Sequence, residues 1–198
     1  QNFSIDTLNN RLVGPVLGNE FTVVDLNELT ANEFTLPSYS TGSEFVYSDH
    51  DEAIFYVSVN EFTLNLYSYS IDTAIVEAKG SFELGLDNSE WSFVNVTDIK
   101  QDETRIVILV NAFSSVSYTN NKSIFISFDK TSGMFDSIFD DVTSLNEKVY
   151  STTFELRGEN IALINAVPDS EDDFVSVIDL VTNTKTRASD DIGLDYVK

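Results

Sequence analysis

The chain has 198 residues, with 33 Asp and Glu against 11 Lys and Arg, and a formal net charge of −22. A surface this acidic repels phosphate backbones and anionic lipid headgroups, so we expect no nucleic acid binding. The absence of Cys excludes disulfides, thiolate metal sites and a cysteine nucleophile. The longest aliphatic run, Ile106–Val110, is too short to cross a bilayer, so we also expect no membrane insertion.

Along the chain, a segment of alternating apolar residues that ends in Asp occurs four times. These segments are Phe21–Asp25, Leu66–Asp72, Ser123–Asp129 and Phe174–Asp179. Successive Asp residues are 47, 57 and 50 positions apart, and a period near fifty residues predicts a repeat architecture. We interpret the Asp as the end of a strand, with a carboxylate that accepts backbone N–H groups of the following turn. This structural role explains the recurrence without catalysis.

A more apolar segment precedes each of these strands. The four segments are Arg11–Leu17, Ala53–Val59, Arg105–Asn111 and Asn160–Val167. Near-continuous apolar runs are typical of strands that are buried on both faces. Pro15 lies in the first of them and argues against a central strand there, because proline cannot donate to a sheet ladder.

Two further segments complete each copy. Upstream are Asn2–Ile5, Glu44–Ser48, Trp91–Val96 and Tyr150–Leu156, and the more polar segments after the Asp turn are Thr73–Ala78, Met134–Phe139 and Thr184–Ala188. The unit is therefore four antiparallel strands in about fifty residues, which predicts an all-β, β-propeller-like fold with about four blades. We expect one domain over residues 1–198, with approximate blades at 1–40, 41–88, 89–145 and 146–198. The blades could close as a four-blade ring or form part of a larger propeller.

The stretch Val175–Thr184 resembles the third strand and turn of blades in the YVTN and WD40-like β-propeller superfamily. The resemblance is strongest in the fourth copy and faint in the first. The Trp-Asp and Gly-His pairs of WD40 repeats and the Tyr-Val-Thr-Asn tetrapeptide are all absent. The resemblance implies a fold and transfers no functional residue.

One acidic loop is a candidate metal site. Asp169, Glu171 and Asp173 place carboxylates at alternate positions, as at the start of a calcium-binding loop. Phe174 then stands where an EF-hand requires Gly, and Leu180 stands where it requires Glu. Calcium is therefore a possible cofactor, and a solvated loop is the alternative.

The remaining candidate residues have structural explanations. His50 is the single histidine and could bind a metal or act as a base, but it has no second ligand in sequence and a turn position explains it. Four aromatic residues could form platforms for a sugar, although alternating aromatics in strands are typical of blade packing. They are Tyr47, Tyr56, Tyr67 and Trp91. No catalytic motif is present, and no pair of the 33 acids can be chosen as a glycosidase pair.

The sequence thus predicts a non-enzymatic extracellular or cell-surface module that binds a protein or glycan through propeller loops. Gln1 in place of Met suggests a processed or trimmed N-terminus. Three Asn-x-Ser/Thr patterns, at Asn2, Asn95 and Asn121, favour a secreted protein. One alternative is a carbohydrate-active enzyme or lyase on a propeller scaffold, so enzyme activity stays open. Another is a structural subunit that forms half of a larger propeller, in which case a homo-oligomer is expected.

Overall fold

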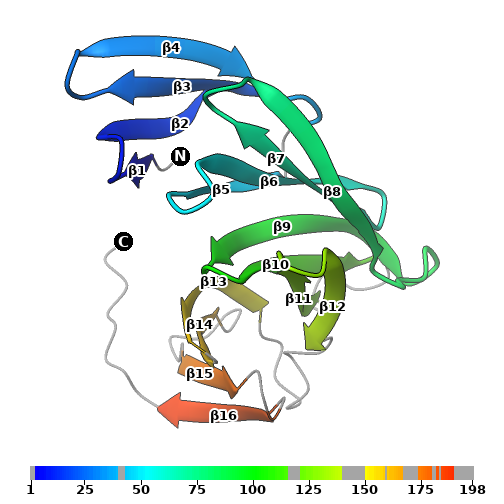
Figure 1. Ribbon diagram of the computed structural model, residues 1–198. Coiled ribbons are helices and arrows are strands. Elements are labelled where there is room, and N and C mark those ends of the chain that lie inside the picture. The colour runs from blue at the N-terminus through cyan, green and yellow to red at the C-terminus, as the bar shows by residue number, and fades with distance from the viewer. Residues whose placement is uncertain are drawn as a thin grey trace. The chain divides into compact units, whose positions relative to one another are not determined.

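The computed structural model describes residues 3–39, 43–115, 121–139, 150–158, 160–166, 174–179, 182 and 184–189. Every regular element within these residues is a β-strand (Figure 1). The strands form four sheets, and each sheet consists of four consecutive strands paired antiparallel. The prediction of an all-β fold built from four-stranded antiparallel blades is confirmed. No helix that could cross a membrane was found within these residues.

The chain divides into two compact units, and the first covers Gln1–Leu84. Its first sheet contains β1 (Ser4–Asp6), β2 (Arg11–Leu17), β3 (Glu20–Asp25) and β4 (Thr30–Thr35), in that order. Its second sheet contains β5 (Glu44–Ser48), β6 (Ala53–Asn60), β7 (Thr63–Ser70) and β8 (Ile75–Glu83). The two edge strands β1 and β5 lie beside each other, so the two sheets approach most closely along their first strands.

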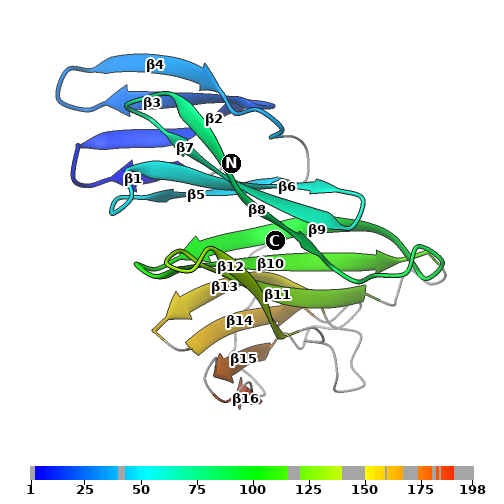
Figure 2. The same cartoon turned by 45° about the vertical axis from the view of Figure 1, so that its right-hand side comes forward.

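The second unit covers Gly85–Lys198 and repeats this arrangement (Figure 2). Its first sheet contains β9 (Trp91–Gln101), β10 (Arg105–Ser114), β11 (Asn121–Asp129) and β12 (Met134–Phe139). Its second sheet contains β13 (Tyr150–Arg157), β14 (Asn160–Ala166), β15 (Phe174–Asp179) and β16 (Thr184–Ser189). Here too the first strands of the two sheets, β9 and β13, lie beside each other.

The core of the first unit lies between its two sheets. Val13 and Val23 of the first sheet and Ile54 of the second are buried in one apolar cluster. Aromatic rings fill the rest of this layer, because an extended strand places every second side chain on the inner face. Phe21 meets the edges of Tyr39 and Phe45 with ring centroids 5.0 Å apart, and Phe34 stacks on Tyr69 at 4.6 Å.

The core of the second unit is more aliphatic. Strand β10 is buried from Ile106 to Ala112, as its continuous apolar sequence predicts for a strand covered on both faces. Phe125 of β11 meets Phe154 of β13 edge to face at 5.2 Å, which joins the two sheets. Ile178 of β15 is buried in the same cluster.

Pro15 does not exclude its segment from the sheet interior, so that inference from sequence was wrong. Strand β2 lies second in its sheet and pairs with both β1 and β3. Among the described residues, however, β1 pairs only with Arg11–Val13, and the register of β2 against β3 shifts between Pro15 and Leu17. Proline is tolerated here because it lies at a bulge and past the end of the described β1 ladder.

Candidate functional site

The predicted calcium ligands Asp169, Glu171 and Asp173 lie outside the described residues, so calcium binding there stays a prediction. Within the described residues, no group of three or more His, Asp or Glu side chains is placed to hold a metal ion. His50 lies in the exposed turn between β5 and β6, in the place that the sequence predicts.

One five-residue turn recurs between strands of this protein. Its first position is Asp or Ser, and its fifth has a positive φ, the left-handed conformation that favours Gly or Asn. The pairs of first and fifth residues are Asp6 and Asn10 (φ 54°), Asp25 and Leu29 (56°), Ser48 and Glu52 (49°), Ser70 and Ala74 (55°), and Asp129 and Gly133 (70°). The turn thus occurs at both β1–β2 and β3–β4 in the first sheet.

The predicted capping role of Asp is confirmed for three of the four recurrent residues. The Oδ1 of Asp25 accepts the backbone N–H of Asn27 at 2.8 Å, and the Oδ1 of Asp129 accepts that of Ser132 at 2.7 Å. The Oδ1 of Asp179 accepts the N–H of Thr182 at 2.9 Å. Hydrogen bonds from Ser132, and then from the Thr131 backbone, hold the pKa of Asp129 below its ordinary value, because the ionised carboxylate is the better acceptor.

Asp72 is the exception, because the strand before it ends two residues earlier than the sequence predicts. Strand β7 ends at Ser70, which takes the capping position, and the Ser70 carbonyl accepts the N–H of Ala74 at 3.0 Å. Asp72 lies within the turn, and its Oδ1 accepts a hydrogen bond from Nη1 of Arg11 at 3.1 Å. Its carboxylate therefore connects the second sheet to the first.

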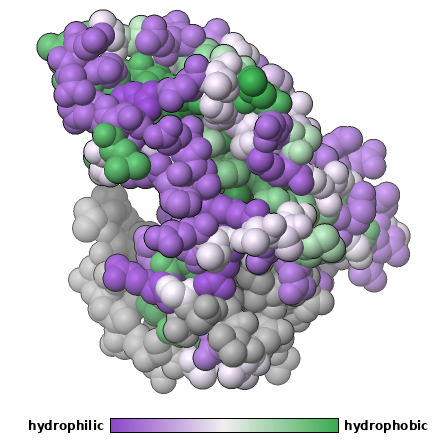
Figure 3. All heavy atoms as spheres, in the orientation of Figure 1, coloured by the Kyte–Doolittle hydropathy of each residue, from purple (hydrophilic) through white to green (hydrophobic). Residues whose placement is uncertain are grey.

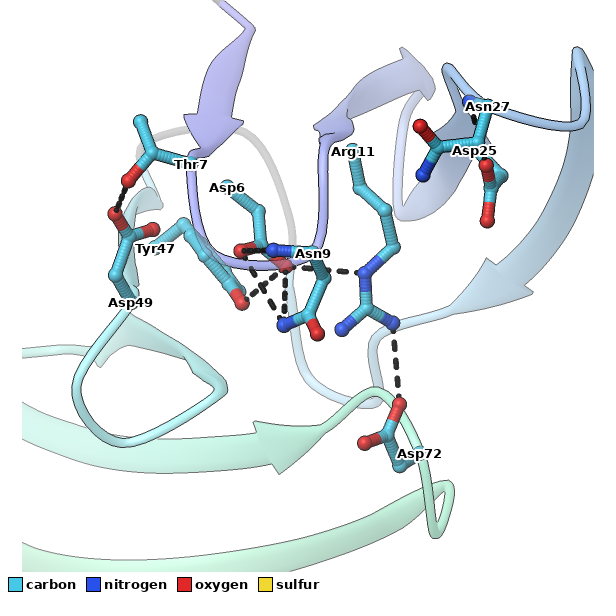
Figure 4. Close-up of polar contacts among 9 residues, drawn as sticks. All are labelled: Asp6, Thr7, Asn9, Arg11, Asp25, Asn27, Tyr47, Asp49 and Asp72. Atoms are coloured by element: carbon cyan, nitrogen blue, oxygen red, sulfur yellow. Dashed lines mark hydrogen bonds and ion pairs between the residues drawn. The ribbon is translucent and has the colours of Figure 1, made fainter.

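Asp6 is the most enclosed carboxylate among the described residues, and sequence analysis did not single it out. Its side chain is fully buried at the end of β1 (Figure 4). Its Oδ1 accepts the backbone N–H of Asn9 at 3.0 Å. Its Oδ2 accepts from Nε of Arg11 at 3.0 Å, from Oη of Tyr47 at 2.7 Å and from Nδ2 of Asn9 at 3.1 Å. The carboxylate is surrounded by donors, so its chemistry is that of a structural anchor and not of a free base.

The titration behaviour of this cluster agrees with that role. Burial by itself would raise the pKa of Asp6. The hydrogen bonds from the Asn9 backbone, Tyr47 and the Asn9 side chain, together with the charge of Arg11, hold that pKa below its ordinary value. Burial, followed by the hydrogen bond and negative charge of Asp6, raises the pKa of Tyr47. Asp6 thus stays ionised and Tyr47 stays protonated near neutral pH, which preserves their short bond.

The four turns 7–10, 26–29, 49–52 and 71–74 are joined at one end of the first unit, and we call them the turn end. Oγ1 of Thr7 donates to Oδ2 of Asp49 at 2.7 Å, which joins the first and third turns. The backbone N–H of Leu26 donates to the carbonyl of Asn10 at 3.0 Å, which joins the second turn to the first. The Arg11–Asp72 pair reaches the fourth turn. Figure 4 shows the Thr7–Asp49 and Arg11–Asp72 bonds on either side of Asp6.

The turn end exposes large apolar side chains. Leu29 is 82% exposed and Leu8 is 69% exposed, and Leu26 and Ile75 are also exposed. Hydrophilic residues cover most of the described surface in Figure 3, with hydrophobic residues in small separate groups. Leu29 is a large, exposed apolar residue in a left-handed conformation, whereas the other described copies of the turn have Asn10, Glu52, Ala74 and Gly133 at this position.

Three of the four aromatic residues considered as sugar platforms are packing residues, as alternating aromatics in strands indicate. Tyr56 is fully buried, and its Oη donates to the carbonyl of Pro37 at 2.9 Å. Tyr67 stacks on Tyr56 with centroids 5.1 Å apart, and Tyr47 is buried beside Asp6. These three tyrosines are therefore packing residues. Trp91, at the start of β9, is only half-buried.

The second unit contains a related arginine contact. Arg105 begins β10 as Arg11 begins β2, and its Nε donates to Oδ2 of Asp102 at 2.8 Å. Its Nη2 donates to the carbonyl of Gly158 in the neighbouring sheet. In both units an arginine at the start of the second strand therefore binds a nearby turn aspartate and reaches the adjacent sheet.

No protein-family model and no curated protein matches the sequence. Solved structures do match in three dimensions. A protein from Lactobacillus plantarum has a TM-score of 0.59 at 13% identity, over 95% of this chain and 53% of that one. A chain of a nidogen/laminin complex has a TM-score of 0.53 at 9% identity, over 93% and 60%. The β-propeller domain of the Trilobed protease from Pyrococcus furiosus has a TM-score of 0.51 at 11% identity, over 90% and 52%.

These similarities define the fold class. The neighbours are β-propeller proteins, and the protein has the β-propeller fold that its repeats predict. The chain spans about half to three fifths of the length of these three neighbours. At identities this low the likeness concerns the fold alone.

Proposed function

We propose that the chain is a non-enzymatic binding module, extracellular or at a cell surface, that engages its partner through the turns between strands. The observation that carries the proposal is the turn end of the first unit. Its four turns are joined by hydrogen bonds at 2.7–3.1 Å, and it exposes Leu8 and Leu29. A surface that is already ordered loses little conformational entropy on binding, and exposed apolar side chains supply contact area.

Two further observations support a binding role. The carboxylates of Asp6, Asp25 and Asp129 accept backbone N–H groups of their own turns. They have a structural use that needs no reaction. In addition, one neighbour with the same fold comes from a nidogen/laminin complex, which is a complex between proteins. That likeness agrees with a protein partner by analogy of fold.

The test is binding of the labelled full chain to arrays of extracellular proteins and of glycans, with turnover of each bound glycan measured in parallel. We expect saturable binding to a protein or a glycan and no change in the bound molecule. Absence of binding on both arrays would contradict the proposal. So would turnover of a polysaccharide that is lost when acidic residues are neutralised, because it would indicate the carbohydrate-active alternative.

A further inference from the structure

The turn end combines exposed leucines with a strong excess of negative charge. Its turns and their flanking residues, 6–11, 25–30, 48–53 and 71–75, contain seven Asp and Glu and one Arg. The arginine, Arg11, is only 14% exposed and is already bound to Asp6 and Asp72. A ligand approaching this end therefore meets apolar side chains within a negative field.

From this combination we propose that the turn end binds a basic segment of another protein, with apolar side chains placed between its Lys or Arg residues. This inference rests on the proposed function and names the partner chemistry of the same surface. Apolar side chains of the partner would cover Leu8 and Leu29, and its cations would lie beside exposed acids such as Glu28 and Glu52. Charge complementarity of this kind directs encounter and selects the partner, while the buried apolar contact supplies most of the affinity.

Leu29 is the residue that most favours a binding role over a purely structural one. Asn or Gly at this left-handed position would make the fold more stable, and a polar side chain would make the surface more soluble. The other described copies of this turn have Asn10, Glu52, Ala74 and Gly133 at the same position, so Leu29 is the one large apolar side chain among them. A leucine that is costly for the isolated chain on both counts is explained if it contacts a partner.

Other occupants fit this surface less well. Asp6 is buried, so a second copy presenting the same end would bring the other six acids against their own copies, and like charges disfavour that contact. A neutral glycan would make no use of the acidic field, and an acidic glycan would be repelled. The peptide experiment below tests the second copy through its mass measurement, and the glycan arrays described above test the glycans.

The experiment uses the full chain and three synthetic peptides of about fifteen residues, a length that spans a typical peptide groove. The first alternates Lys or Arg with Leu and Trp, the second replaces its cations by Glu, and the third replaces its apolar residues by Ser. Binding is followed by fluorescence anisotropy from about 0.05 to 0.5 M NaCl, a range over which screening becomes strong. Native mass is measured in parallel by light scattering.

The chain offers matched control variants. Leu17 is the last residue of β2, at the opposite end of that strand from the turn end, and is 73% exposed. Leu17→Asn is therefore the control for Leu29→Asn. Glu61 has a φ of 54° in the β6–β7 turn, against 49° for Glu52 in the β5–β6 turn. Glu61→Gln is therefore the control for Glu52→Gln.

We expect the basic apolar peptide to bind and the other two peptides to bind at least about tenfold more weakly. High salt and Leu29→Asn should each reduce its affinity about tenfold, and Glu52→Gln about threefold. Leu17→Asn and Glu61→Gln should leave the affinity unchanged. Equal binding of the acidic peptide, equal effects of Leu29→Asn and Leu17→Asn, or self-association abolished by Leu29→Asn would each overturn the inference.

The inference and the proposed function fail in distinguishable ways. If no peptide binds but the chain binds a protein or glycan on the arrays with an affinity that Leu29→Asn does not change, the inference falls and the binding function stands. If neither the peptides nor the arrays are bound, both fall.

Discussion

Neutralising Asp6 should destabilise the first unit more than any comparable change at its surface. In Asp6→Asn the shape is kept, but the negative acceptor for Arg11 and Tyr47 is lost. In either orientation the amide NH2 group also faces a donor, which is Arg11 and Tyr47 in one orientation and the Asn9 backbone N–H in the other. Arg11 is 14% exposed and retains only Asp72, which is itself 59% exposed. Charge-assisted hydrogen bonds contribute about 1.5–3 kcal/mol each, and removing one partner of a buried pair costs about 3–5 kcal/mol. Because Asp72 remains, we expect a loss of about 2–4 kcal/mol.

The matched control is Asp72→Asn, which removes the exposed partner of the same arginine. An exposed ion pair contributes up to about 1 kcal/mol, so the loss should stay below that value. Urea unfolding of the full chain measures both variants. Trp91 is the single tryptophan and lies in the second unit, so its fluorescence follows that unit. Five of the eight tyrosines belong to the first unit, so their near-ultraviolet circular dichroism reports mainly on that unit. Equal losses for the two variants would refute the argument that burial of Asp6 sets its contribution.

Three further predictions concern pH, backbone conformation and packing. The pKa of Asp6 is lowered in the folded chain, so its stabilisation is complete above the unfolded value of about 3.8 and is lost as pH falls through the lower folded value. Acid titration monitored by circular dichroism should therefore show a shallower loss of stability for Asp6→Asn than for the wild type, and equal slopes would contradict this. Leu29→Asn should raise the free energy of unfolding by about 0.5–1 kcal/mol in urea, because Asn tolerates the left-handed conformation. Destabilisation would show that Leu29 packs in the fold. Gly14→Ala should cost about 1 kcal/mol in the same assay, because the added Cβ would lie 2.5 Å from Cδ1 of Phe3, and an unchanged midpoint would mean that the ring moves freely.

Much of the fold could be predicted because strand alternation is a local property of the sequence. The strands Arg11–Leu17, Glu44–Ser48 and Met134–Phe139 have the bounds that the sequence predicts. The blade boundaries between them stay a prediction. Asp72 shows where local patterns fail. Ser and Asp both favour turns, so the sequence does not show whether the strand ends at Ser70 or at Asp72. The structure shows that it ends at Ser70, which forms the last pair of the β7–β8 ladder with Ile75.

The candidate site could be predicted less well, because it depends on contacts between distant residues. Asp6 and Tyr47 are 41 positions apart, and no single sequence indicates that they meet. The sequence does contain one informative pattern: Asn10 follows Asp6 by four positions, as Leu29 follows Asp25. That spacing marks a capped turn but does not reveal that Leu29 projects into solvent.

The most direct test of the account is the affinity of the full chain for the basic apolar peptide in the wild type, in Leu29→Asn and in Leu17→Asn, with the stability of each measured in urea. The account predicts that Leu29→Asn is more stable than the wild type and binds about tenfold more weakly, while Leu17→Asn binds as the wild type does. Unchanged binding by Leu29→Asn would contradict the claim that the turn end of the first unit is the binding surface.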